Sequence, residues 1–216
     1  MSAPAVGARA SRRWLLAGGG AFVGLWLVVL ALIAAKNPPE SEPAPSAASA
    51  DAGFARDMAV HHQQAVDLSF IVRDRTDDED VRRLAFDVIN TQANQRGMLL
   101  GRLEVWGLPT VSDKPPMAWS GRGMAYEPHD GSLMPGMATN TQIDQLRKAE
   151  GRTAEILYLR LLTEHHRAGV DMAQRAADLA DDEQIKDLAE GMVRGQQSEM
   201  KLMADMLAER GASPTK

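Results

Sequence analysis

The chain repeats itself at a spacing of 104 residues, and this repeat limits the possible folds more than any other feature of the sequence. Residues 54–107 align without a gap on residues 158–211, and 14 of the 54 aligned pairs are identical. The identical pairs include two adjacent histidines in each copy, at 61–62 and 165–166. Two copies are too few for a solenoid, so the repeat predicts two related units that pack on each other.

Each copy has the periodicity of a helical hairpin. Apolar residues recur at alternating spacings of three and four, which is typical of one face of an α-helix. Acidic turns at 76–80 and 181–184 supply carboxylates that favour a helix N-terminus. We therefore predict an all-α fold, a ferritin-like four-helix bundle made from a duplicated helical hairpin with one long crossover. The predicted segments are the domain 51–210, with hairpins 51–107 and 141–210 and crossover 108–140, and a tail, 211–216.

An apolar segment precedes this domain. Residues 14–35 carry no charge, and as a helix of 22 residues they would extend about 33 Å, enough to cross a bilayer core of roughly 30 Å. Three arginines lie just before the segment, so the positive-inside rule places residues 1–13 in the cytoplasm and the domain outside. A Pro/Ala/Ser linker, 36–50, joins this predicted transmembrane anchor to the bundle.

A cleaved signal peptide is the alternative interpretation of this segment. Its apolar core would usually be shorter, about 7–15 residues, with a small-residue cleavage site directly behind it. The obvious Ala-Ser-Ala stretch, 48–50, lies well downstream, whereas residues 11–16 (SRRWLL) are similar to a twin-arginine export signal. The domain is extracytoplasmic on either interpretation, tethered to the cell membrane by a single span or secreted if the segment is cleaved.

Polar residues interrupt the apolar stripe of every predicted helix at one height. They are His61, Gln92, Gln95, His165, Gln196 and Glu199. Residues equidistant from the turn of an antiparallel hairpin lie at the same height, so we expect Gln92 to face His61 and Gln196 to face His165. Buried polar groups are costly unless they are paired. This layer is therefore either a structural feature that fixes helix register or a coordination or proton-transfer site, and its repetition favours a site.

The second histidine of each pair lies about 100° further around its helix. His62 and His166 either turn inward beside the core histidines or are partly exposed and without a role. Methionines gather near the histidines and in the crossover, where packing of the open end of the bundle is an alternative explanation for them. Thioether and imidazole groups together suit Cu(I) and Ag(I). The candidate metal ligands are His61, His62, His165, His166, Met58, Met172, Glu199, Met203, Met134 and Met137.

Five further polar residues are candidates for a supporting layer around those ligands. They are Gln92, Gln95, Gln196, Asp51 and Glu155. Residues 51–216 carry 20 Lys+Arg and 27 Asp+Glu, an acidic balance that does not suit nucleic acid but is compatible with cations. The chain has no cysteine, which excludes a disulfide, a lipoprotein anchor and cysteine-based zinc sites. No nucleophile triad or phosphate-binding loop is present in the sequence.

The sequence resembles the bacterial family called domain of unknown function 305. The resemblance rests on D-x-x-F-x-x-x-M-x-x-H-H-Q-Q-A-V at 51–66, M-P-G-M at 134–137, and L-x-x-L-x-x-H-H-x-x-G-V-x-M-A at 159–173, and it spans about 50–207. Gln95, Leu162 and Glu155 stand where the family usually has Glu, Met and Asp. The resemblance implies a ferritin-like fold, and for some members copper binding and resistance outside the cytoplasm.

We therefore predict a membrane-tethered, extracytoplasmic protein that binds or sequesters copper as Cu(I), and by extension Ag(I), without catalysis. Its expected partners are the metal ion and the membrane, and we expect no binding to nucleic acid. The sequence leaves open whether the protein forms a homo-oligomer. One alternative is a non-catalytic envelope interaction module whose polar layer is purely structural. The other is a ferritin-like oxidase, which would require Glu-x-x-His on two helices, a motif that no predicted core stripe carries.

Overall fold

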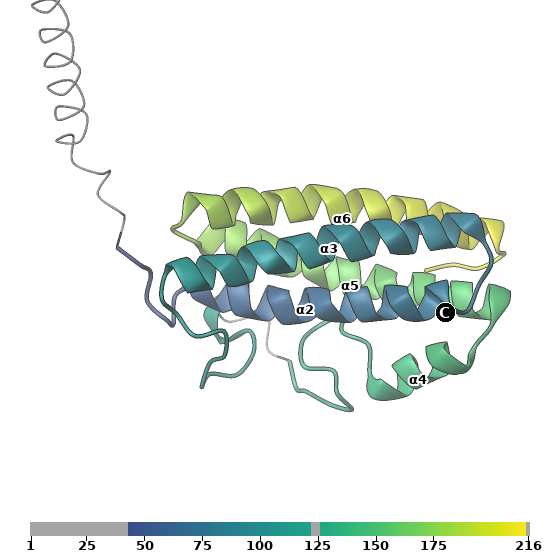
Figure 1. The fold of residues 1–216 in the computed structure, drawn as a ribbon, viewed down its shortest axis with the longest axis horizontal. Helices are drawn as coiled ribbons and strands as arrows, with labels where there is room; N and C mark the ends of the chain where they lie inside the picture. Colours follow the sequence, from purple (N-terminus) through teal and green to yellow (C-terminus); the bar gives the residue numbers. More distant parts are fainter. Residues whose placement is uncertain (1–42, 122–125, 215–216) are drawn as a thin grey trace, which may run out of the picture. The chain divides into compact units, whose positions relative to one another are not determined.

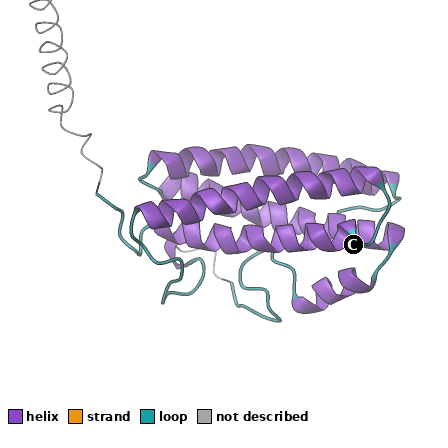
Figure 2. Cartoon of the chain, viewed as in Figure 1, coloured by secondary structure: helices purple, strands orange, loops and turns teal. Residues whose placement is uncertain are grey.

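The computed structural model describes residues 43–121 and 126–214. Within these residues the protein contains five α-helices and one short 3-10 helix, and it has no β-strand, which confirms the predicted all-α class (Figure 2). None of the described helices combines the length and the apolar character needed to cross a membrane. The predicted anchor, residues 14–35, and the first part of the linker, 36–42, lie outside the described residues.

Four long helices form two hairpins that pack side by side (Figure 1). The first hairpin consists of α2 (Ala50–Arg73) and α3 (Glu79–Val105), and the second of α5 (Gly151–Leu179) and α6 (Glu183–Glu209). The two hairpins meet mainly through α2 and α5. The repeated halves of the sequence thus become the two halves of one bundle.

Side-chain caps explain why the long helices begin where they do. Asp78 accepts a hydrogen bond from the Val81 N–H at 3.0 Å and caps α3. Its equivalent in the repeat, Asp182, accepts from the Ile185 N–H at 3.0 Å and caps α6. The acidic turns therefore act at the helix N-termini, where a carboxylate satisfies free N–H groups and opposes the helix dipole.

The long connection between the hairpins contains structure that the sequence pattern did not predict. A 3-10 helix, η1 (Ala118–Ser120), and a short helix, α4 (Asn140–Lys148), lie within or at the end of this segment. Thr139 and Gln142 form a capping box at the start of α4. Residues 141–148, assigned above to the second hairpin, therefore form a separate helix before α5.

Candidate metal centre

The four paired histidines lie between two apolar clusters of the bundle core. One cluster includes Phe54, Met58, Leu99, Met134, Met172 and Met192. The other includes Leu68, Val88, Tyr158, Leu162, Met203 and Leu207. The histidine side chains are at most 1% exposed, and Gln92 and Gln196 are buried with them. We call these six residues together with Gln95 and Glu199 the histidine layer.

His61 on α2 and His165 on α5 are in direct contact across the interface between the hairpins. Their ring centroids are 3.7 Å apart, and the ring planes are inclined by 32°. His165 Nε2 donates a hydrogen bond to the backbone oxygen of His61 at 2.9 Å. His61 Nε2 donates to the backbone oxygen of Pro135 at 3.2 Å. Both core histidines thus use Nε2 to bind a carbonyl oxygen.

The second histidine of each pair also points inward and is fully buried. His62 Nε2 lies 2.8 Å from Gln95 Oε1, and His166 Nε2 lies 2.6 Å from Glu199 Oε2. The sequence expectation paired Gln92 with His61 and Gln196 with His165. The contacts seen here instead join the second histidine of each pair to the residue three positions further along the second helix of its hairpin.

Every layer histidine leaves its other ring nitrogen free of protein partners. Nδ1 of His61, His62, His165 and His166 is buried and has no hydrogen-bond partner. A neutral imidazole has one N–H donor and one lone-pair acceptor. Because the Nε2 atoms of His61, His165 and His166 face carbonyl or carboxylate oxygens, these rings when neutral carry their proton on Nε2 and present a lone pair at Nδ1.

Burial keeps His61, His62 and His165 uncharged near neutral pH. Desolvation lowers the pKa of His61 to about 4, against the opposing hydrogen bond to Pro135. Desolvation likewise lowers the pKa of His62 to about 3 and holds the pKa of His165 well below its usual range. A neutral imidazole can donate a lone pair to a cation, whereas a protonated one cannot.

The two buried glutamines have unused hydrogen-bonding capacity. Both amide atoms of Gln92 are buried without a partner, and so is Oε1 of Gln196. Gln196 Oε1 packs so closely on Gly169 that a methyl group at that position would overlap it. Buried amides without partners are costly, so the polarity of this layer exceeds what packing of the four helices alone requires.

A reverse turn from the crossover covers the layer on the side of α2 and α5. The Met137 N–H bonds the Met134 oxygen at 3.2 Å, with Pro135 and a positive-φ glycine between them. Gly136 has φ +76°, as the third residue of a type II turn requires. A methyl group there would overlap the Ala168 side chain and lie 2.7 Å from the Glu164 oxygen. The turn therefore packs directly on α5 beside His165.

Gln64 fastens the same turn to α2. Its Oε1 accepts from the Ala138 N–H at 2.6 Å, and its Nε2 donates to the Ala138 oxygen at 2.9 Å. The sequence reasoning missed this role, although Gln64 follows the first histidine pair directly. The repeat gave no signal for it, because the equivalent of Gln64 is Ala168; in the structure the Ala168 side chain lies beside Gly136 of the turn.

The predicted methionine ligands divide between the two apolar clusters. Met58, Met134 and Met172 are buried in the first cluster. Met203 lies in the second cluster, where its sulfur is 3.8 Å from the Thr163 hydroxyl. Met137 is partly buried and packs against the first cluster. The structure thus places four of the five thioethers in or against the cluster on one side of the layer, and Met203 on the other side.

Asp51 and Glu155 lie at the turns and not beside the histidines. Asp51 accepts from the backbone N–H groups of Asp181 and Asp182 at 3.0 and 2.9 Å, in the turn of the second hairpin. Glu155 accepts from the Thr76 hydroxyl at 2.6 Å, in the turn of the first, and from Arg210 at 2.7 Å. Each carboxylate therefore joins the first helix of one hairpin to the turn of the other.

The donor set of the layer fits a soft cation better than a hard one. Among the described residues, no three His, Asp or Glu side chains stand close enough to hold a metal by themselves. Imidazole nitrogens with free lone pairs and nearby thioethers are the donors that Cu(I) and Ag(I) prefer. In this arrangement, a complete ligand set would combine layer histidines with methionines of the first cluster.

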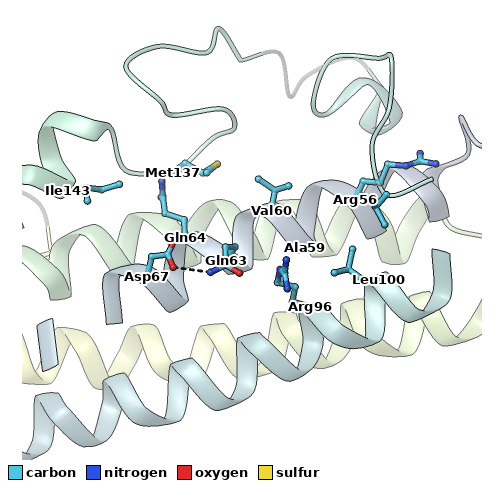
Figure 3. Close-up of a pocket in the computed structure, with 11 residues that line it drawn as sticks. Arg56, Ala59, Val60, Gln63, Gln64, Asp67, Arg96, Leu100, Met137 and Ile143 are labelled. Atoms are coloured by element: carbon cyan, nitrogen blue, oxygen red, sulfur yellow. Dashed lines mark hydrogen bonds between the residues drawn. The ribbon is translucent and has the colours of Figure 1, made fainter. Parts of the chain in front are cut away.

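A surface cavity of about 440 Å³ lies on the outer side of α2 (Figure 3). Val60 and Gln63 of α2 line it together with Arg96 of α3, Met137 of the crossover and Ile143 of α4. None of the layer histidines lines this cavity. Gln64 and Met137 border both the cavity and the covering turn, so the cavity adjoins the layer without opening into it.

Comparison with known proteins gives one family match. A family model described as Domain of unknown function (DUF305) matches residues 51–207. A crystal structure of a DUF305 protein from Streptomyces coelicolor is 57% identical, with a TM-score of 0.72 over 78% of this chain and 98% of that one. A DUF305 fragment from Deinococcus radiodurans is 28% identical, with a TM-score of 0.63 over 77% and 99%.

A more distant similarity extends to a protein called CopM. Its Cu(I)-bound form is 18% identical, with a TM-score of 0.56 over 74% of this chain and 96% of that one, which is a similarity of fold. CopM has also been solved in Ag-bound, Cu(II)-bound and apo forms. A comparison with curated proteins finds no match.

Proposed function

We propose that this chain, which belongs to the DUF305 family, binds copper as Cu(I) in its histidine layer, with Ag(I) as a close substitute, and sequesters it without catalysis. One observation carries this proposal: four buried imidazoles in one layer hold their Nε2 atoms in hydrogen bonds and leave their Nδ1 atoms without partners.

This hydrogen-bond pattern is the one expected of histidines prepared for metal binding. A ligating histidine almost always donates its other ring N–H to a carboxylate or carbonyl, which fixes the tautomer and orients the ring. Backbone oxygens do this for His61 and His165, and Glu199 does it for His166. Met58, Met134 and Met172 would supply soft sulfur donors from the first apolar cluster.

The choice of copper has further support from the fold. CopM, the neighbour solved with Cu(I), Ag and Cu(II), shares the helical architecture at 18–21% identity. That similarity transfers no ligand residues to this chain. It favours copper among the soft cations that the donor set would accept.

Location is the second part of the proposal. We place the ferritin-like bundle outside the cytoplasm, tethered by residues 14–35 or secreted if that segment is cleaved. The Streptomyces coelicolor relative is described as a candidate secreted protein. Fractionation of cells that produce the tagged full chain tests this part, because a cytoplasmic soluble protein would contradict it.

Competition with chromophoric Cu(I) chelators tests the metal-binding part. We expect the full chain to bind Cu(I) with a sub-micromolar Kd, and alanine at the four layer histidines to abolish this binding. His129→Ala is the matched control, because His129 is an exposed histidine of the crossover. Binding weaker than about micromolar, or equal binding by the quadruple variant, would overturn the proposal.

A purely structural layer is the competing interpretation, and one observation favours it: within the described residues the histidines, with Asp and Glu, assemble no group of three that could hold a metal. On this interpretation His61→Ala lowers stability strongly, whereas Cu(I) or Ag(I) leaves the melting temperature of the native chain unchanged. An oxidase is less consistent with the layer, where Glu199 is the single carboxylate among the described residues.

A further inference from the structure

The two halves of the histidine layer differ at one pair of equivalent positions. Gln95 lies 2.8 Å from His62 Nε2, and Glu199 lies 2.6 Å from His166 Nε2. In the repeat, Glu199 is equivalent to Gln95 and His166 is equivalent to His62. Each histidine is 33 residues from its hydrogen-bond partner in sequence. The same local geometry therefore holds a neutral amide in one half and a carboxylate in the other.

The amide and the carboxylate constrain the ring in different ways. An ionised carboxylate only accepts hydrogen bonds, so Glu199 requires the proton of neutral His166 to be on Nε2 and leaves the lone pair on Nδ1. A glutamine amide can turn either its oxygen or its NH₂ group toward a ring nitrogen. Gln95 is therefore compatible with both tautomers of His62, and only one of them presents a lone pair at the buried Nδ1.

The position of Glu199 also argues against its being a metal ligand itself. Its carboxylate bonds Nε2, whereas a cation bound by His166 would lie at Nδ1, on another edge of the same ring. The carboxylate acts through the ring: it raises the basicity of the imidazole, and its negative charge favours a cation beyond the ring. Its side chain is 24% exposed, so this charge is partly shielded from solvent.

We propose that Glu199 is a positioning residue that makes the α5–α6 half of the layer the tight metal site, whereas Gln95 leaves the α2–α3 half weak. The first cation binds through His166, and a second binds more weakly through His62. This inference rests on the proposed function for its metal-binding part. Its tautomer part concerns the metal-free protein and can be tested separately.

Nitrogen-15 NMR of the histidine rings in the metal-free full chain tests the tautomers at neutral pH. We expect His166 as a single Nε2–H tautomer and His62 as a mixture of both. Glu199→Gln should convert His166 into a mixture, and Gln95→Glu should convert His62 into a single Nε2–H form. A His166 ring with its proton on Nδ1, or one unchanged by Glu199→Gln, overturns the proposal.

Titration with Cu(I), and separately with Ag(I), tests the inequality of the two halves. We expect two binding steps in the native chain, with the tight step weakened about 10–100-fold by Glu199→Gln. Gln95→Glu should strengthen the weak step. Glu190→Gln on α6, at an exposed carboxylate paired with Arg194, and Asn94→Asp on α3 are matched charge controls that should change neither step.

The double variant Gln95→Glu/Glu199→Gln keeps the net charge and exchanges the halves. Adding His62→Ala to this double variant should abolish its tight binding step, whereas adding His166→Ala should leave that step intact. In the native chain we expect the reverse, because there the tight step depends on His166. This variant also decides the case in which Glu199→Gln alone fails to fold. A tight step that stays with His166 in the double variant overturns the proposal.

The outcomes separate this inference from the function on which it rests. If metal binds but Glu199→Gln and the native chain bind alike, the inference fails and the function stands. If no variant binds Cu(I) or Ag(I), the function fails, and the unequal metal sites fail with it. The NMR result then still decides whether Glu199 fixes the His166 tautomer.

Discussion

His165 donates a hydrogen bond to the backbone oxygen of His61 while its ring stacks on the His61 ring at 3.7 Å. The two histidines occupy the same position in the two copies of the repeat, 104 residues apart. The contact therefore joins the hairpins at a point where each supplies the same side chain. The contribution of this contact to stability, the protonation of the histidines and the packing of the covering turn at 134–137 can each be tested.

His165→Ala should destabilise the protein by about 2–4 kcal/mol. The change removes a ring from a fully buried contact and leaves a cavity in the interface between α2 and α5. Urea unfolding followed by circular dichroism measures the effect. His129→Ala, at an exposed position, should stay within about 0.5 kcal/mol of the native chain, and equal effects of the two changes would contradict the central role of the contact.

Mild acid should unfold the domain, because the folded pKa values of His61, His62 and His165 lie below the unfolded value of about 6.5. The unfolded chain takes up protons first as pH falls. The histidines therefore cost no stability above pH 6.5. As the pH falls, His61 destabilises the folded state progressively down to about pH 4 and His62 down to about pH 3. Protonation linked to His165 lowers the stability in the same direction. Each histidine contributes about 1.4 kcal/mol per pH unit within its window.

Urea midpoints between pH 7.5 and 4 measure this dependence. The double variant His61→Gln/His62→Gln should show a shallower loss over the same range, because it lacks two of the titrating rings. A free energy of unfolding that stays constant from pH 6.5 to 4.5 would show that the histidines titrate alike in the folded and unfolded chains.

Gly136→Ala should displace the covering turn from α5. The new methyl group meets the Ala168 side chain and the Glu164 oxygen at a position with φ +76°. Gly107→Ala is the matched control, with φ +65° and no atom within 4 Å of the new methyl. We expect about 1–2 kcal/mol of backbone strain at Gly107 and a larger loss at Gly136. Equal losses would mean that the turn does not pack on α5 as described.

Gln64→Ala should loosen the crossover while leaving the four long helices folded. The change removes both hydrogen bonds to Ala138. Hydrogen exchange at the Ala138 amide and proteolytic cleavage within 108–140 should both accelerate. Gln63→Ala, which removes only an exposed bond to Asp67 (Figure 3), should leave both rates near those of the native chain.

Bound metal should raise the melting temperature in a concentration-dependent way. A ligand that binds only the folded state at 100 times its Kd adds about 2.7 kcal/mol of stability. Differential scanning fluorimetry with Ag(I) is a convenient readout, and a chelator should reverse the shift. Zn(II) and Mg(II) should have little effect, and a larger shift with either would contradict the preference for a soft cation.

The sequence was sufficient to predict the all-α class and a buried layer around both histidine pairs. Both predictions rest on the helical spacing of apolar residues and on the 104-residue repeat, and both of these patterns can be seen in the sequence without coordinates. The partners of the histidines were not predictable in the same way. That Gln95 meets His62 depends on the position of α2 along α3, a register decided by packing over the whole hairpin.

Two further features depend on contacts between segments far apart in sequence. The hydrogen bond from His61 to Pro135 requires the crossover to fold back over α2, and nothing in the local sequence fixes that path. Asp51 and Glu155 aligned in the repeat and suggested a role beside the histidines. Their roles became clear only from the packing of the two hairpins, in which each carboxylate bonds to the turn of the other hairpin.

Those two carboxylates have a consequence for how the chain assembles. Asp51 completes the turn of the second hairpin and Glu155 that of the first, so each half carries a part that the other needs. The domain is in effect a dimer whose protomers have been fused by the crossover. A chain cut within that crossover should yield two fragments that are poorly folded apart and regain native helicity by complementation when mixed.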